Sequence, residues 1–149
     1  MSFATTPHFG QRVKGVVYKD RPGAYAVIRD EAGRIAVVLT GKAYFLPGGG
    51  CDNSESCEQT LAREGLEECG RSILVVRELG KAVQYVSTRS GKHYAKQCAY
   101  FEGKFDNAPV RKPSEPDNVL HFLSPAEAMS QLVLEADRWA LSRLLESTD

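Results

Sequence analysis

Three glutamates have the spacing that points most directly to chemistry: Glu64, Glu67 and Glu68. Residues three and four positions apart lie on one face of a helix, so the three carboxylates would emerge together. Like charges at this spacing repel each other by about 0.2–0.5 kcal/mol per pair. A divalent cation reverses that repulsion, and hard oxygen ligands favour Mg²⁺ or Mn²⁺ over zinc. The alternative is a charged helix face that contacts only solvent.

A glycine-rich segment just before these glutamates favours the metal site over the solvated face. Gly48, Gly49 and Gly50 follow Leu46 and Pro47. Backbone without side chains lets carbonyl oxygens reach a metal and lets amides approach a phosphate. Mg²⁺ is typically held by one or two carboxylates together with substrate phosphates. The two features together therefore predict a metal-dependent site for a phosphorylated substrate.

From the glycines to the end of the predicted helix, the chain resembles the Nudix box of the Nudix (MutT-like) hydrolases. The box occupies about one sixth of the chain, and its many fixed positions make the resemblance specific. The matching residues are Leu46, Pro47, Gly48, Gly49, Glu55, Arg63, Glu64, Leu66, Glu67, Glu68, Cys69 and Gly70. Gly65 and Arg71 stand where the family usually has aliphatic residues. In a helix interior, Gly65 is expected to cost about 1 kcal/mol against alanine and to forfeit a core contact.

The resemblance implies an enzyme that hydrolyses the pyrophosphate bond of a nucleoside diphosphate linked to a further group. The metal, Mg²⁺ or Mn²⁺, would be held by Glu64, Glu67, Glu68 and a main-chain carbonyl of Gly48 or Gly49. Arg63 would pair with Glu55 and hold the glycine loop against the helix, in an ion pair expected to be mostly exposed to water. Metals that neutralise the diphosphate and lower the pKa of an attacking water are consistent with this chemistry.

The group that removes the proton from the attacking water stays open between two positions. Glu64 is one candidate, and a carboxylate from a later loop is the other. Glu115 lies in a proline-rich loop where many relatives carry an additional ligand or base, and Glu102 and Asp106 are its rivals. A solvated loop residue is the alternative interpretation of Glu115.

Residues expected to contact substrate are Gly48, Gly49, Gly50 and Lys96. Lys96 alternates with Lys92 and Tyr94 on one face of a predicted strand, where it could meet a phosphate or a base. An ordinary solvated strand face is the alternative.

The compact size resembles family members that cleave nucleoside triphosphates, so normal or oxidised (deoxy)nucleoside triphosphates are the expected substrates. Two alternatives remain: a dinucleoside polyphosphate or RNA 5′-end pyrophosphohydrolase, and a non-catalytic module that senses nucleotides. The intact acidic helix argues against the sensor, because sensing alone does not require three clustered carboxylates.

The elements that must position these residues are a mixture of strands and helices. Strands are predicted at residues 13–18, 24–28, 34–39, 73–79, 83–88, 93–101 and 119–123, with a turn at 20–23 and a long loop at 106–118. A helix at 55–69 would have Ser54 as N-cap and Gly70 as C-cap. Ser124, Pro125 and Glu127 form a capping-box pattern, and a last helix is predicted at 136–145. We therefore expect an α/β protein, a Nudix-type α/β/α sandwich with a central mixed sheet.

Length and charge limit the remaining possibilities. A chain of 149 residues fits one domain, residues 1–149. The 19 basic and 19 acidic side chains cancel, so no bulk nucleic acid or anionic membrane is expected as a partner. No apolar run approaches the roughly 18–20 residues of a membrane span, and the start lacks a secretory signal pattern. We expect a cytoplasmic monomer or homodimer that acts on a small nucleotide.

Overall fold

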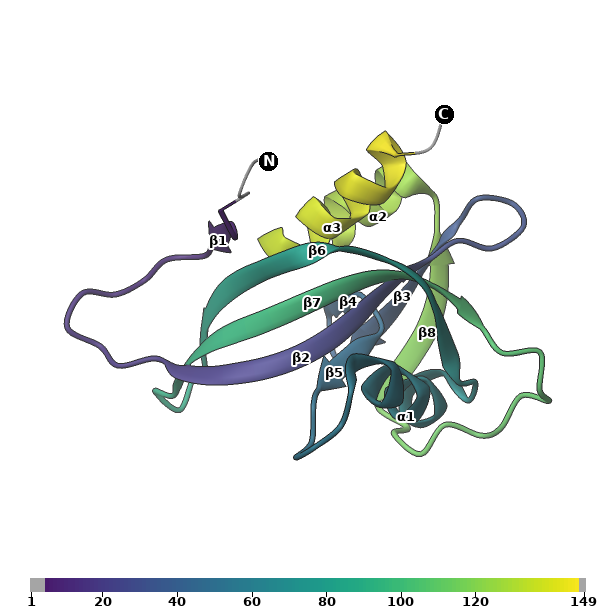
Figure 1. Ribbon diagram of the computed structural model, residues 1–149, viewed down its shortest axis with the longest axis horizontal. Helices are drawn as coiled ribbons and strands as arrows, with labels where there is room; N and C mark the ends of the chain where they lie inside the picture. Colours follow the sequence, from purple (N-terminus) through teal and green to yellow (C-terminus); the bar gives the residue numbers. More distant parts are fainter. Residues whose placement is uncertain (1–4, 148–149) are drawn as a thin grey trace.

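The computed structural model describes residues 5–147, whose strands form two sheets (Figure 1). Within these residues, the larger sheet has five strands in the order β1-β6-β7-β2-β5 and the smaller has three in the order β4-β3-β8. The bounds of the larger sheet are β1 His8–Phe9, β6 Ile73–Ser87, β7 His93–Phe105, β2 Lys19–Ile28 and β5 Gly48–Gly50. Those of the smaller are β4 Ala43–Phe45, β3 Ile35–Thr40 and β8 Asn118–Leu123.

The larger sheet is mixed, as predicted. Strand β2 runs parallel to β7 along its whole length, while β6 is antiparallel to β7 and β5 is antiparallel to β2. The smaller sheet is purely antiparallel, and its separation from the mixed sheet was not predicted.

Helices cover the mixed sheet on both faces. Figure 1 shows α1 (Cys57–Cys69) on one side and α2 (Pro125–Gln131) with α3 (Glu135–Glu146) on the other. Alternate side chains of β2 follow this division: Tyr25 and Val27 pack in the cluster that contains α3, whereas Ala24 and Ala26 pack in the cluster that contains α1. The expected α/β/α sandwich is therefore confirmed. Among the described residues, no helix combines the length and apolar character that crossing a membrane requires.

Three strand predictions need correction. Residues 13–18 form no strand, and the predicted turn at 20–23 is part of β2. Pro22 is tolerated there because β5 pairs with β2 only from Gly23 onward, so this part of β2 resembles an edge. The predicted strands 73–79 and 83–88 are one strand, β6, which accommodates its irregular middle by register shifts at Val75/Arg77 and Glu78/Gly80.

Helix α1 begins two residues later than predicted. Its N-cap is Ser56, which forms a capping box with Gln59, and Ser54 instead has a left-handed backbone with φ of 69°. Gly70 ends the helix in the left-handed conformation, as predicted. The capping box of Ser124 and Glu127 at the start of α2 is also confirmed.

Candidate active site

The position of α1 depends on a close approach to β6. A Cβ atom on Gly65 would collide with the carbonyl oxygen of Arg71 and would lie 2.8 Å from Cγ1 of Ile73. The expectation that Gly65 forfeits a core contact is therefore wrong, because no space for a side chain exists there. Arg71 lies outside the helix, with its guanidinium 6.0 Å from the ring centre of Phe105.

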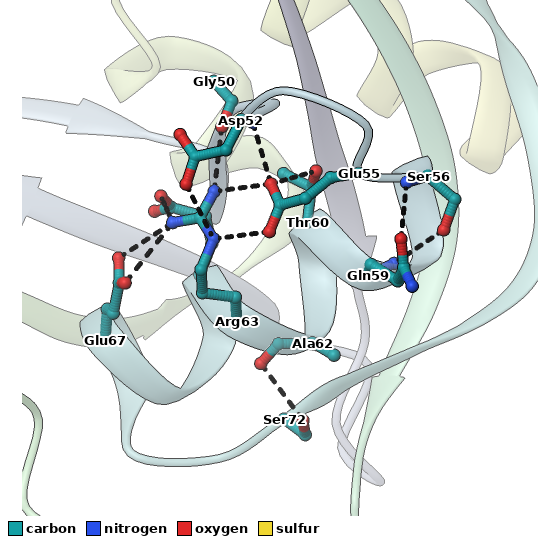
Figure 2. Close-up of polar contacts among 11 residues, drawn as sticks. Gly50, Asp52, Glu55, Ser56, Gln59, Thr60, Ala62, Arg63, Glu67 and Ser72 are labelled. Atoms are coloured by element: carbon teal, nitrogen blue, oxygen red, sulfur yellow. Dashed lines mark hydrogen bonds and ion pairs between the residues drawn. The ribbon is translucent and has the colours of Figure 1, made fainter.

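Arg63 is the centre of a polar network that joins α1 to the segment before it (Figure 2). It binds Glu55 through two nitrogens, Nε to Oε2 at 2.8 Å and Nη2 to Oε1 at 2.9 Å. Nη2 also donates to the carbonyl oxygen of Gly50 at 3.0 Å. Nη1 donates to Glu64 Oε1 at 2.8 Å and to Glu67 at 3.2 Å. The predicted pair of Arg63 and Glu55 is thus present, but both side chains are partly buried rather than mostly exposed.

Glu55 is held as an anion by the same network. Besides Arg63, its Oε1 accepts hydrogen bonds from the Asp52 amide at 2.8 Å and from the Thr60 hydroxyl at 3.0 Å. The hydrogen bonds from Arg63 are the main reason why the pKa of Glu55 falls to about 2. Sequence reasoning missed Asp52 and Thr60, because only the fold of the loop shows that they meet Glu55.

A second carboxylate cluster lies on the other side of Arg63. Glu64, Glu67 and Glu115 each offer an oxygen atom within 4.8 Å of the others. The loop that carries Glu115 is tied to the helix by a hydrogen bond from the Glu115 amide to the Glu67 carbonyl, 3.1 Å long. Asn118 donates to the Glu115 carboxylate and accepts from the Thr40 hydroxyl, so Glu115 is also tied to the smaller sheet.

The rival loop carboxylates lie elsewhere. Glu102 is paired with Arg77 at 2.7 Å and with Arg29 at 3.6 Å. Asp106 accepts a hydrogen bond from the Ala108 amide, within its own turn. Of the three candidates, Glu115 is the one that joins Glu64 and Glu67.

The side chain of Glu68 points from α1 toward β5 and is buried there. Glu68 is not part of the group formed by Glu64, Glu67 and Glu115. Its Oε1 accepts the Gly48 amide at 2.9 Å, and its side chain is nearly inaccessible to solvent. Burial raises the pKa of Glu68 to about 8 and that of Glu64 to about 7, with neighbouring carboxylates contributing to both shifts. Four carboxylates thus converge with one arginine, a donor set of hard oxygens that fits a divalent cation such as Mg²⁺ or Mn²⁺.

Two of the three glycines of β5, Gly48 and Gly49, are required by close approach. Gly48 has φ of 138°, and a Cβ there would collide with the carbonyl oxygen of Ala24. A Cβ on Gly49 would lie 2.6 Å from the carboxylate carbon of Glu64. The strand can therefore pack against β2 and against Glu64 of α1 only if Gly48 and Gly49 carry no side chain.

Lys96, on β7, lies on the face of the mixed sheet opposite to α1, beside β5. Its ammonium is 4.9 Å from the ring centre of Tyr25, and the guanidinium of Arg21 is 4.3 Å from the ring centre of Tyr94. These four residues line a cavity of about 120 Å³ together with Pro22, Gly50 and Val86. Two cations stacked on aromatic rings beside the glycine strand suit an anionic or aromatic ligand.

Comparison with known proteins agrees with this geometry. A sequence model of the NUDIX domain matches residues 19–145. No curated protein sequence matches the chain. The MutT protein of Methanosarcina mazei Go1 is 21% identical with a TM-score of 0.68, over 91% of this chain and 100% of that chain.

Two further solved structures have the same fold. The MutT NUDIX hydrolase of Burkholderia pseudomallei is 25% identical with a TM-score of 0.58, over 85% of this chain and 98% of that chain. An ADP-ribose pyrophosphatase of Streptococcus suis 89-1591 is 20% identical with a TM-score of 0.58, over 87% and 93% of the two chains. Because the family match spans most of the chain and the motif residues meet at one place, the chain belongs to the Nudix hydrolases, enzymes of the pyrophosphatase kind.

Proposed function

We propose that this enzyme hydrolyses normal or oxidised (deoxy)nucleoside triphosphates to the monophosphate and pyrophosphate, with Mg²⁺ or Mn²⁺. The observation that carries the metal-dependent chemistry is the convergence of Glu64, Glu67 and Glu115 within 4.8 Å of one another. Their mutual repulsion is costly without a cation, and the cation is most useful next to substrate phosphates. The preference for triphosphates rests on the compact size of the chain. A panel of nucleotide substrates tests this preference most directly.

The residues proposed to hold the cation are Glu64, Glu67, Glu68 and a main-chain carbonyl of Gly48 or Gly49. When bound, the cation neutralises the diphosphate and lowers the pKa of an attacking water. Arg63 keeps Glu64 and Glu67 oriented through its Nη1, and its Nη2 binds the carbonyl of Gly50. In this proposal Arg63 and Glu55 fix the geometry and touch no reacting atom.

Two carboxylates are proposed as alternatives for the proton acceptor. Glu64 offers a carboxylate oxygen within 4.8 Å of oxygens of Glu67 and Glu115, at the place where the attacking water would be held. Glu115 is fixed by Asn118 and by the backbone of Glu67, at the end of a loop that faces the acidic helix. We propose that Gly48 and Gly49 contact the substrate phosphates, and that Lys96 and Gly50 contact the part of the nucleotide that enters the cavity beside Tyr25.

A nucleotide panel tests this function. The panel contains dGTP, an oxidised guanine triphosphate, ADP-ribose, a UDP-sugar, a dinucleoside tetraphosphate and a 5′-triphosphorylated RNA, each with Mg²⁺. We expect the triphosphates to release pyrophosphate and the activity to disappear in EDTA. Full turnover in chelator would contradict the metal site. If the dinucleotide or the RNA is cleaved faster than the nucleoside triphosphates, that compound is the preferred substrate. Binding without any cleavage would indicate a sensor.

Single substitutions assign the carboxylates. Glu67→Gln and Glu68→Gln should lower turnover by about 10- to 100-fold or more and reduce the stabilisation by Mg²⁺ in thermal melts. Glu115→Gln should keep that stabilisation and lose turnover only if Glu115 is a ligand or base in the substrate complex. The matched control is Glu58→Gln, an exposed glutamate in the first turn of the same helix. If Glu67→Gln and Glu68→Gln behave like the control, the acidic face is only a solvated surface.

A further inference from the structure

Asp137 is a buried carboxyl that none of the roles described above uses. It is the third residue of α3 and is only 2% exposed. Its Oδ1 accepts the hydroxyl of Tyr100 at 2.7 Å, and its Oδ2 accepts the amide of Leu46 at 3.1 Å. In the first turn of α3, the Ala136 amide donates to a different buried acceptor, Gln84 Oε1, at 2.9 Å. Burial of a carboxyl is costly, so its placement against one particular backbone amide needs an explanation.

That amide belongs to the segment that leads into the glycine strand. Leu46 and Pro47 connect β4 to Gly48, the first residue of β5, and Leu46 is itself buried. The pyrrolidine ring fixes the backbone at Pro47 and restricts the residue before it. The Pro47 carbonyl also accepts the Ala26 amide at 2.9 Å. The segment is therefore stiff, and a displacement at Leu46 moves Gly48.

Gly48 is the point at which this segment meets the acidic helix. Its amide donates to Glu68 Oε1 at 2.9 Å, a buried contact. The amide that Asp137 binds and the amide that Glu68 binds thus belong to the first and third of three consecutive residues, with proline between them. Asp137 lies 91 positions from Leu46 in the chain, on the helix that covers the opposite face of the mixed sheet from α1 (Figure 1).

We propose that Asp137 is a positioning residue. By binding the Leu46 amide, it fixes the position of residues 46–48 relative to α1, so that the Gly48 amide meets Glu68. The helix on one face of the sheet thereby holds the glycine strand against the acidic helix on the other face. The catalytic consequence rests on the function proposed above, whereas the positioning itself is a property of the metal-free protein.

The test compares substitutions that remove both hydrogen bonds of Asp137 or only the one to Tyr100. Asp137→Leu keeps the branched shape of the side chain, with two larger methyl groups in place of the oxygens, and removes the acceptor for both Leu46 and Tyr100. Asp137→Asn keeps an acceptor for Leu46. Tyr100→Phe removes the other hydrogen bond to the same carboxyl and leaves the Leu46 contact intact, so it is the matched control for a change that only weakens the core. Asp137→Ala replaces Asp137→Leu if the leucine variant fails to fold.

Backbone hydrogen exchange of the metal-free, full-length protein is the main readout. The amide of Val37, buried in β3, reports global unfolding and corrects for general loss of stability. We expect Asp137→Leu to accelerate exchange at Leu46 and Gly48 by at least about 10-fold beyond the change at Val37. Asp137→Asn and Tyr100→Phe should leave the Gly48 amide as protected, relative to Val37, as in the unaltered protein.

Activity gives a second readout. The Mg²⁺ concentration for half-maximal turnover should rise about 10-fold in Asp137→Leu and stay unchanged in Tyr100→Phe. Equal protection of Gly48 in Asp137→Leu and Tyr100→Phe would overturn the positioning role and leave Asp137 as a core residue. An unaltered protein that cleaves no nucleotide would overturn the proposed function, while the exchange result would still decide the role of Asp137.

Discussion

At the scale of single residues, Arg63 is placed so that one guanidinium serves several acceptors. Its planar fork binds Glu55 through Nε and Nη2 and reaches Glu64 and Glu67 through Nη1. A lysine offers no such fixed fork, so it cannot replace these contacts together. The three carboxylate acceptors come from the loop before α1 and from two turns of that helix. Arg63 therefore decides how the acidic face of the helix is oriented.

Arg63→Ala should lower turnover by about 10- to 100-fold, because Glu64 and Glu67 lose the group that orients them. The free energy of unfolding should also fall, since Glu55 keeps its charge without its partner. Steady-state kinetics and urea unfolding measure the two effects. Arg71→Ala is the control, because Arg71 belongs to the same motif but contacts an aromatic ring outside the network. Equal turnover of the two variants would remove Arg63 from the site.

Glu55 should make stability depend on acidity in a defined range. Its pKa is about 2 in the folded protein, against an ordinary value of 4.5. The unfolded chain therefore binds more protons between these two values, and the stabilisation by Glu55 is present above pH 4.5 and lost as the pH falls toward 2. Glu55→Gln should melt at a lower temperature than the unaltered protein at pH 6, and the difference should vanish near pH 2. A difference that stays constant over this range would show that the charge of Glu55 is unimportant.

At the scale of elements, the C-terminal part of α1 packs closely against β6 because Gly65 has no side chain. A Cβ there would collide with the Arg71 carbonyl and would crowd Ile73. Although alanine is the better helix former, Gly65→Ala should destabilise the protein by about 1–3 kcal/mol, because the helix must move away from the strand. Gly50→Ala is the control for stability, since its Cβ would meet only the Pro22 carbonyl at 3.8 Å. A more stable Gly65→Ala protein would mean that the helix adjusts freely.

At the scale of the whole molecule, the site exists because a helix, a glycine strand and a distant loop converge. This convergence places Glu64 and Glu68, with pKa values of about 7 and 8, in surroundings that disfavour their charged forms. Between pH 4.5 and about 8 the folded, metal-free protein binds more protons than the unfolded chain does. Its stability should therefore fall as the pH rises through this range.

Thermal melts at pH 5.5, 7.0 and 8.5 measure this dependence. Mg²⁺ should stabilise the protein most at pH 8.5, where the carboxylates are charged and bind the cation best. Glu68→Gln should be less sensitive to pH between 5.5 and 8.5 in the absence of metal. The exposed Glu58→Gln should retain the dependence of the unaltered protein. A pH dependence equal in both variants would show that Glu68 is not the origin of the effect.

The sequence by itself determined those features that arise from local spacing. Glu64, Glu67 and Glu68 share a helix face because of the helical period, and Gly70 and Ser124 mark helix ends because their backbone or hydroxyl suits those positions. The mixed α/β character followed from the alternation of strand and helix patterns. The start of α1 was misplaced by two residues, because Ser54 was taken as the cap although Ser56, three residues before Gln59, has the capping-box pattern that the structure uses.

Tertiary structure alone decided the contacts between segments that are far apart in the chain. Glu115 was the preferred loop carboxylate in the sequence, with Glu102 and Asp106 as rivals, and only the folding of the long loop against α1 brought Glu115 to Glu64 and Glu67. Pro22 and Gly23 have the composition of a turn, yet pairing with β7 and β5 keeps them in a strand. Gly65 was judged by its helix propensity, which ignores the neighbouring strand. Local spacing decides which side chains share an element, but packing between elements decides which of them meet.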